Sequence, residues 1–189
     1  RNDWSWGDDV VRPTLRQLAQ DESGAIVALA QRELGERFFY AASATELLFT
    51  ENETNAQRLF GAPNPSPYVK DGIGAYIVHG AKDAVNPAKQ GTKVAAHYPL
   101  TLGAGESRTI RLRLSDQPIG NPQQAIGELC GNAFEAVFET RLQEADEFYA
   151  AVIPPSLDAD AARAWFVGAE PPRTITITVP AGAEVRMTS

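Results

Sequence analysis

The chain has 189 residues, of which 43% are hydrophobic and 22% are charged, and it carries a formal net charge of −7 at pH 7. This length and composition fit one globular domain and exclude a largely disordered chain. The acidic balance argues against nucleic acid as a partner, and the lack of an apolar run of ~20 residues argues against a membrane partner.

Apolar runs between turn residues predict β-strands in the first half of the chain. Such runs occupy residues 24–31 and 36–50 and are rich in β-branched and aromatic residues, which favour strands. Residues 61–75 carry several prolines and glycines. They predict a long irregular loop, because proline removes a backbone donor and glycine permits positive φ. Residues 76–79 then predict another short strand.

Alternating polar and apolar residues between 93 and 114 predict an antiparallel hairpin. The alternation runs from 94 to 102 and again from 110 to 114, with a Gly-Ala-Gly sequence at 103–105. A period of two places one set of side chains on a buried face and the other set in water. Because a glycine-containing loop joins the two runs, we expect them to pair with each other.

Residues 132–152 predict one long amphipathic helix, because their apolar side chains recur at steps of three and four. Asn132 suits the N-cap position, and the proline pair at 154–155 ends the helix. We expect the apolar stripe to pack on the sheet or on a further domain. The alternating residues 174–179 predict a strand in a short, divergent tail.

These elements predict a mainly β fold, an antiparallel β-sandwich with one long C-terminal amphipathic helix and a short divergent β tail. We divide the chain into a β-sandwich portion over residues 1–131, a linker helix region over 132–163 and a divergent tail over 164–189. The single cysteine, Cys130, excludes an internal disulfide. We read it as a small packing residue, and it fits a reducing, cytoplasmic compartment.

Acidic side chains flank the predicted loop, and Glu51, Glu53 and Asp71 are the nearest. A paired-acid active site is one interpretation, but surface carboxylates are far more often structural. The two histidines, His79 and His97, lack a third ligand at a recognisable spacing, so we expect half-buried histidines and no metal site. Nothing in the sequence indicates a cofactor.

Several segments resemble one family, the large bacterial glucosidase-like proteins related to glycoside hydrolase family 63 and to mannosylglycerate hydrolase. The resemblance covers roughly residues 1–163, and the chain opens as if cut from a longer protein. The segments that carry it are WSWGDD at 4–9, LFTENETN at 48–55, NPSPYVKDGI at 64–73, DAVNP at 83–87 and GTK at 91–93.

The resemblance implies the latter part of an N-terminal β-sandwich, followed by a linker helix that leads to an α/α-barrel. The family's two catalytic carboxyl groups sit in that barrel, so we expect no catalytic residue in this chain. It is then a non-catalytic part of a glycoside hydrolase whose partners are the α/α-barrel of the same protein and an oligosaccharide.

Two other functions stay open at this stage, a free-standing β-sandwich module that binds carbohydrate or protein and a small hydrolase in its own right. Within the long loop, the candidate substrate-binding residues are Tyr68, Lys70 and Asp71. An aromatic face accepts the apolar side of a sugar, and the charged pair suits hydroxyl groups.

Overall fold

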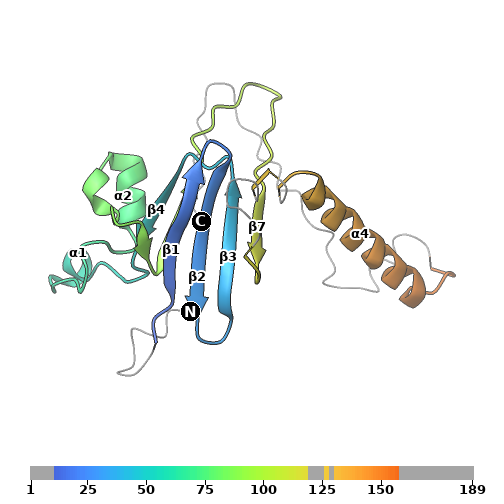
Figure 1. The fold of residues 1–189 in the computed structure, drawn as a ribbon, viewed down its shortest axis with the longest axis horizontal. Helices are drawn as coiled ribbons and strands as arrows, with labels where there is room; N and C mark the ends of the chain where they lie inside the picture. Colours follow the sequence, from blue (N-terminus) through green and yellow to red (C-terminus); the bar gives the residue numbers. More distant parts are fainter. Residues whose placement is uncertain (1–10, 119–125, 128–129, 158–189) are drawn as a thin grey trace.

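The fold consists of two antiparallel β-sheets with helices outside them (Figure 1). The computed structural model describes residues 11–118, 126–127 and 130–157. Within these residues, sheet A has five strands in the order β5-β1-β2-β3-β7, and sheet B pairs β4 with β6. The strands are β1 (Thr14–Asp21), β2 (Gly24–Gln31), β3 (Gly35–Ala42), β4 (Glu46–Thr50), β5 (Gln90–Gly91), β6 (Lys93–His97) and β7 (Leu112–Ser115).

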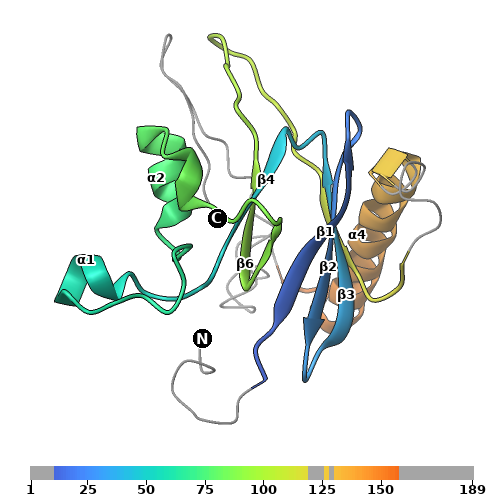
Figure 2. The same cartoon turned by 60° about the vertical axis from the view of Figure 1, so that its left-hand side comes forward.

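The helices lie on opposite sides of the two sheets (Figure 2). Helix α2 covers sheet B, and α4 lies on the far side of sheet A. No helix in the described part of the chain is both long and apolar enough to cross a membrane. The helices are α1 (Ala56–Phe60), α2 (Gly72–His79), the short 3₁₀ helix η1 (Lys82–Ala84) and α4 (Asn132–Val152).

The main core lies between the two sheets, as expected for a sandwich. Ala25 and Val27 of sheet A are fully buried against Leu47 and Phe49 of sheet B. The intervening residues of the same strands point to the outer faces, because side chains alternate along a strand. The predicted mainly β, antiparallel fold with one C-terminal helix is thereby confirmed over the described residues.

Both sheets are also covered on their outer faces. Ile126 packs on Ile26 and Tyr40 of sheet A. Ile73 of α2 packs on Leu48 of sheet B. The central strands are therefore buried on two sides, which explains why their sequences read as continuous apolar runs.

The predicted hairpin between residues 93 and 114 is wrong. Both runs contain strands, but β6 pairs with β4 in sheet B and β7 pairs with β3 in sheet A. The glycine-containing segment belongs to a connection that passes from one sheet to the other. Periodicity identifies a strand and its buried face, but it does not identify the partner strand.

The strand predicted over 76–79 is also wrong, because these residues end helix α2. Ile73, Tyr76 and Ile77 occupy steps of three and four, so one helical face reaches sheet B. Gly80 ends the helix with a φ of 69°, a left-handed conformation that glycine adopts without steric cost. The irregular loop predicted over 61–75 ends correspondingly earlier, at residue 71.

Helix α4 spans the predicted residues, and a proline pair follows it. Its N-cap is Gly131 rather than Asn132, and no side chain caps it. None of its residues is buried, and Phe138, Leu142 and Phe148 are 62%, 61% and 57% exposed. The expected packing of its stripe on the sandwich is therefore not seen. The strand predicted at 174–179 lies outside the described residues.

Candidate functional site

The chain that leaves strand β4 runs alongside the loop before α2, and backbone hydrogen bonds join them. The N–H of Glu51 donates to the carbonyl of Tyr68 at 2.8 Å, and the N–H of Lys70 donates to the carbonyl of Glu53 at 3.0 Å. These bonds hold the two segments in fixed register. The candidate residues near 51 and near 70 are thus neighbours in space.

Two further segments close the other side of β4. The N–H of Asn86 donates to the carbonyl of Phe49 at 2.8 Å, and the N–H of Thr92 donates to that of Thr50 at 3.1 Å. The Thr92 Oγ1 also accepts a 2.7 Å bond from the N–H of Asn52. Segments 48–55, 64–73, 83–87 and 91–93 therefore meet at the end of one strand, whereas residues 4–9 lie outside the described part of the chain.

Glycine permits this close approach at two places. A Cβ on Gly72 would lie 2.2 Å from the carbonyl oxygen of Ala84, and one on Gly91 would lie 2.4 Å from that of Thr50. Both distances are far below van der Waals contact with backbone atoms that have no freedom to rotate away. Gly72 thus allows the start of α2 to lie against η1, and Gly91 allows β5 to lie against the end of β4.

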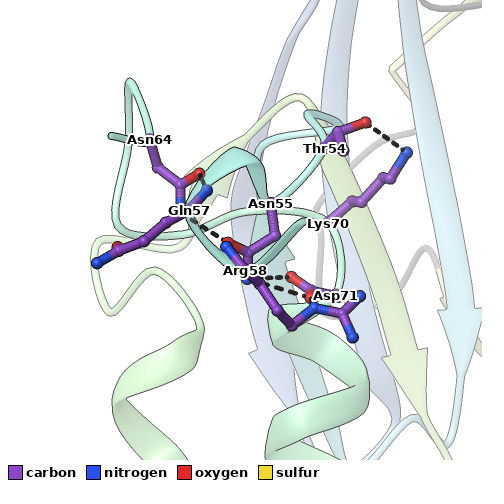
Figure 3. A network of polar contacts seen from close by, with 7 residues as sticks. All are labelled: Thr54, Asn55, Gln57, Arg58, Asn64, Lys70 and Asp71. Carbon is purple, nitrogen blue, oxygen red and sulfur yellow. Dashed lines mark hydrogen bonds and ion pairs between the residues drawn. The ribbon is translucent and has the colours of Figure 1, made fainter. Parts of the chain in front are cut away.

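Asn55 is the centre of a polar network that fixes the loop (Figure 3). Its Oδ1 accepts from the N–H of Arg58, which caps helix α1, and from the Nδ2 of Asn64, both at 3.0 Å. Its Nδ2 donates to both carboxylate oxygens of Asp71 at 3.2 Å. One side chain therefore ties the start of α1 to both ends of the proline-rich loop.

The other charged groups of the network are paired as well. The Nε of Arg58 lies 3.0 Å from Oδ2 of Asp71. The Nζ of Lys70 donates to Oγ1 of Thr54 at 3.0 Å (Figure 3). Lys70 and Asp71 thus bind residues of the preceding segment and not each other.

The two glutamates of the ENETN segment also have partners. The Oε2 of Glu51 accepts from the hydroxyl of Thr92 at 2.8 Å. Glu53 is 5% exposed, and its Oε1 lies 2.9 Å from Nη1 of Arg12. A buried carboxylate is stable only when its charge is compensated. Arg12, which no sequence pattern singled out, supplies that charge.

A cavity of about 620 Å³ opens beside the network. The described residues that line it supply amide and hydroxyl groups together with proline and glycine, and none of them has a charged side chain. Such a surface offers hydrogen bonds to a neutral polar molecule and apolar CH groups to its flat faces. The residues that line the cavity are Gln57, Gly61, Pro63, Asn64, Ser66 and Pro67.

The three candidate substrate-binding residues lie next to this cavity in sequence, but they are not among its lining residues. Tyr68 is half-buried, and its N–H donates to Oγ of Ser66 at 3.1 Å. Lys70 and Asp71 serve the network described above. Their observed contacts are structural, and the polar residues of the cavity lining are Gln57 of α1 and Asn64 and Ser66 of the loop.

A second polar cluster joins α2 to sheet B, and sequence analysis missed it. The carboxylate of Glu46 accepts from Oη of Tyr76 at 2.7 Å and lies 2.9 Å from Nδ1 of His97. Burial opposes ionisation of Glu46, but the bonds from Tyr76 and His97 outweigh it and keep its pKa below the ordinary value. The Nζ of Lys82 lies 3.7 Å from the centre of the Tyr76 ring.

The two histidines have different environments. His97 is half-buried, as expected, whereas His79 is exposed at the end of α2. Among residues 11–118, 126–127 and 130–157, no group of His, Cys, Asp and Glu side chains is arranged to hold a metal ion. Cys130 is 6% exposed, and burial raises the pKa of its thiol, which fits its expected packing role.

Comparison with known proteins gives one significant relative. The chain is 38% identical over 112 residues to the uncharacterized protein YMR196W of Saccharomyces cerevisiae. The alignment covers 57% of this chain and 10% of the yeast protein, so the chain spans about a tenth of the length of that relative. No family model and no solved structure matches the chain.

Proposed function

We propose that this chain is a non-catalytic β-sandwich part of a glucosidase-like glycoside hydrolase, whose catalytic centre lies in an α/α-barrel of the same protein. The proposal rests first on the family resemblance of the segments that meet at the end of β4. These segments are distant in sequence, and hydrogen bonds hold them together in space.

The state of the carboxylates supports a non-catalytic role. Inverting hydrolysis needs one carboxyl group as an acid and a second as a base, about 6.5–9.5 Å apart with room for a water molecule between them. Glu53 is buried against Arg12, and Asp71 is bound by Asn55 and Arg58. Both groups are engaged in local contacts, which supports a structural role for them.

The observation that supports a role in sugar recognition is the uncharged cavity beside the Asn55 network. Sugars bind through hydrogen bonds to hydroxyl groups and through contact of their CH faces with apolar surfaces. Gln57 and Ser66 supply the polar groups, and Pro63 and Pro67 supply apolar surface. An anionic ligand would meet no positive charge in this lining.

The apolar stripe of α4 supports a partner domain. Phe138, Leu142 and Phe148 are each more than half exposed. Burying one such side chain contributes about 1.5–3 kcal/mol, so contact with another domain would stabilise the helix strongly. The short span of this chain relative to the yeast protein leaves ample room for such a domain in a longer relative.

The test is a calorimetric titration of the full chain with maltotriose, followed by an assay for release of glucose. We expect measurable binding and no hydrolysis. Gln57→Ala and Ser66→Ala should each weaken binding about fivefold, because a lost neutral hydrogen bond costs about 1 kcal/mol. Gln143→Ala, on helix α4, is the matched control and should bind as the unchanged chain does.

Two results would contradict the proposal. Glucose release by the purified chain would show that it carries its own catalytic site. Binding that is absent, or that the two cavity variants leave unchanged, would remove the assigned role of the loop. The adjacent coding sequence offers a separate check, since the proposal expects an α/α-barrel to be encoded there.

A free-standing carbohydrate-binding module is the second candidate, because described residues of this chain alone line the cavity. The two candidate functions differ in whether a partner domain normally covers the apolar stripe of α4. A part of a larger enzyme should self-associate when it is isolated, since its apolar surface lacks the natural partner. Sedimentation that shows a monodisperse monomer would favour the free-standing module.

A further inference from the structure

A second cavity, of about 420 Å³, opens between the turn after β3 and the connection from β6 to β7. It lies away from the loops at the end of β4, and the glycosidase proposal assigns it no role. Its polar lining includes Arg108, Arg111, Ser43 and Thr109. All four side chains can donate hydrogen bonds, and none of the described residues that line the cavity is Asp or Glu.

The two arginines differ in how they are used. Arg111 donates to the carbonyl of Cys130 at 2.7 Å and forms an ion pair with Glu135, so its position is fixed. Arg108 is exposed and has no partner among the described residues. Within the described part of the chain, Arg108 therefore places an uncompensated guanidinium at a cavity in a protein of net charge −7.

The remaining ionisable groups of the cavity stay neutral. Burial raises the pKa of Tyr98 to about 12, so its phenol remains protonated in any ordinary buffer. Burial also raises the pKa of Cys130. Neither group therefore adds a negative charge that would offset the arginines. Because Glu135 offsets the charge of Arg111, the positive charge of the described lining at neutral pH comes from Arg108.

The rest of the lining is apolar. The side chains of Leu100 and Ile110 are half-buried at the cavity, and Tyr98 also packs against the main core. Most small-molecule sites are cavities of about 300–1,000 Å³ with apolar walls and a few placed polar groups. Guanidinium pairs with carboxylate in a planar geometry, which makes arginine well suited to recognise that group.

We propose that this cavity binds a small organic acid, with its carboxylate on Arg108 beside the Thr109 hydroxyl and its apolar body against Leu100 and Ile110. The site is independent of the sugar site, because the two cavities have no lining residue in common. Each proposal can therefore fail while the other stands.

Three probes separate the two parts of the recognition. Hexanoate carries both the carboxylate and an apolar chain, acetate carries only the charge, and 1-hexanol carries only the chain. In titrations of the full chain followed by NMR, hexanoate should bind at least tenfold more tightly than either of the others. Equal affinity for hexanoate and 1-hexanol would refute a role for Arg108, and no saturable binding of hexanoate would refute the site.

Variants locate the site. Arg108→Met keeps the aliphatic stem and removes the charge, so it should weaken hexanoate binding at least tenfold. Arg32→Met, at an exposed turn in sheet A, is the matched control and should leave binding unchanged. Ile110→Trp should fill the cavity and abolish binding, and circular dichroism checks that the variant remains folded. Hexanoate binding that survives Arg108→Met unchanged would overturn the inference.

Discussion

Replacing Asn55 by alanine should destabilise the loop more than any other single truncation in the network. Alanine removes the N-cap of α1, the bond to Asn64 and the bonds to the Asp71 carboxylate. An N-cap is worth about 1 kcal/mol, a neutral hydrogen bond about 1 kcal/mol and a bond to a charged group about 1.5–3 kcal/mol. Because Asn55 and Asp71 are only partly buried, we expect a net loss of about 2–3 kcal/mol.

Urea denaturation measures the global part of this loss, and hydrogen exchange at the amide of Arg58 measures the local part. Gln57→Ala is the matched control: no described residue bonds to its side chain, so the change should stay within about 0.5 kcal/mol. Asn55→Asp keeps the capping oxygen but places a second carboxylate against Asp71. The loss of stability caused by Asn55→Asp should become smaller as the pH falls. An Asn55→Ala variant as stable as the unchanged chain, with Arg58 exchange unaltered, would refute the network.

Three further predictions concern stability. Gly72→Ala should lower the free energy of unfolding in urea by more than about 2 kcal/mol, because the added Cβ would lie 2.2 Å from the carbonyl oxygen of Ala84. Gly74→Ala, in the same helix, has open space around the added Cβ and should raise the free energy of unfolding by about 0.5–1 kcal/mol. The folded-state pKa of Glu46 lies below its ordinary value of 4.5. The stability that ionised Glu46 contributes is therefore fully present above pH 4.5 and is lost as the pH falls through the lower, folded-state pKa. Glu46→Gln should flatten this part of the curve of unfolding free energy against pH. Tyr98→Phe should raise the free energy of unfolding by about 1 kcal/mol, since the hydroxyl is buried without a partner among the described residues; a loss of stability would contradict this.

The parts of the fold that were predictable are those in which short-range pattern decides the outcome. The apolar runs at 24–31 and 36–50 became β2, β3 and β4 because β-branched and aromatic side chains fill a two-sided core. Helix α4 kept its predicted limits because its stripe and the following proline pair act locally.

The errors arose where tertiary contacts decide. The sequence of residues 76–79 has strand propensity, but Tyr76 and Ile77 reach sheet B from one face of a helix that Gly80 ends. The pairing of β7 with β3 depends on which edge is open in the finished sheet, and no spacing in the sequence reports this. Propensity is a weak guide in such places because packing overrides it.

The site was predictable in part for the same reason. Asparagine is a common N-cap residue, and Asn55 caps α1. Its partners Asn64 and Asp71 lie 9 and 16 residues further along the chain, so only the fold could join them. The pairing of Arg12 with Glu53 lies beyond any local motif, because the strands of sheet A separate the two residues in sequence.

Both edge strands of sheet A come from parts of the chain that are synthesised after β1, β2 and β3. Strand β5 pairs with β1, and β7 pairs with β3, whereas β1, β2 and β3 follow one another directly. A growing polypeptide that stops before Leu112 has therefore made a meander whose outer backbone groups on β3 are unsatisfied. Such an edge recruits other strands. Interrupted translation of this protein should yield aggregates rather than shorter folded products, because β7 is the strand that covers the β3 edge in the described part of the chain.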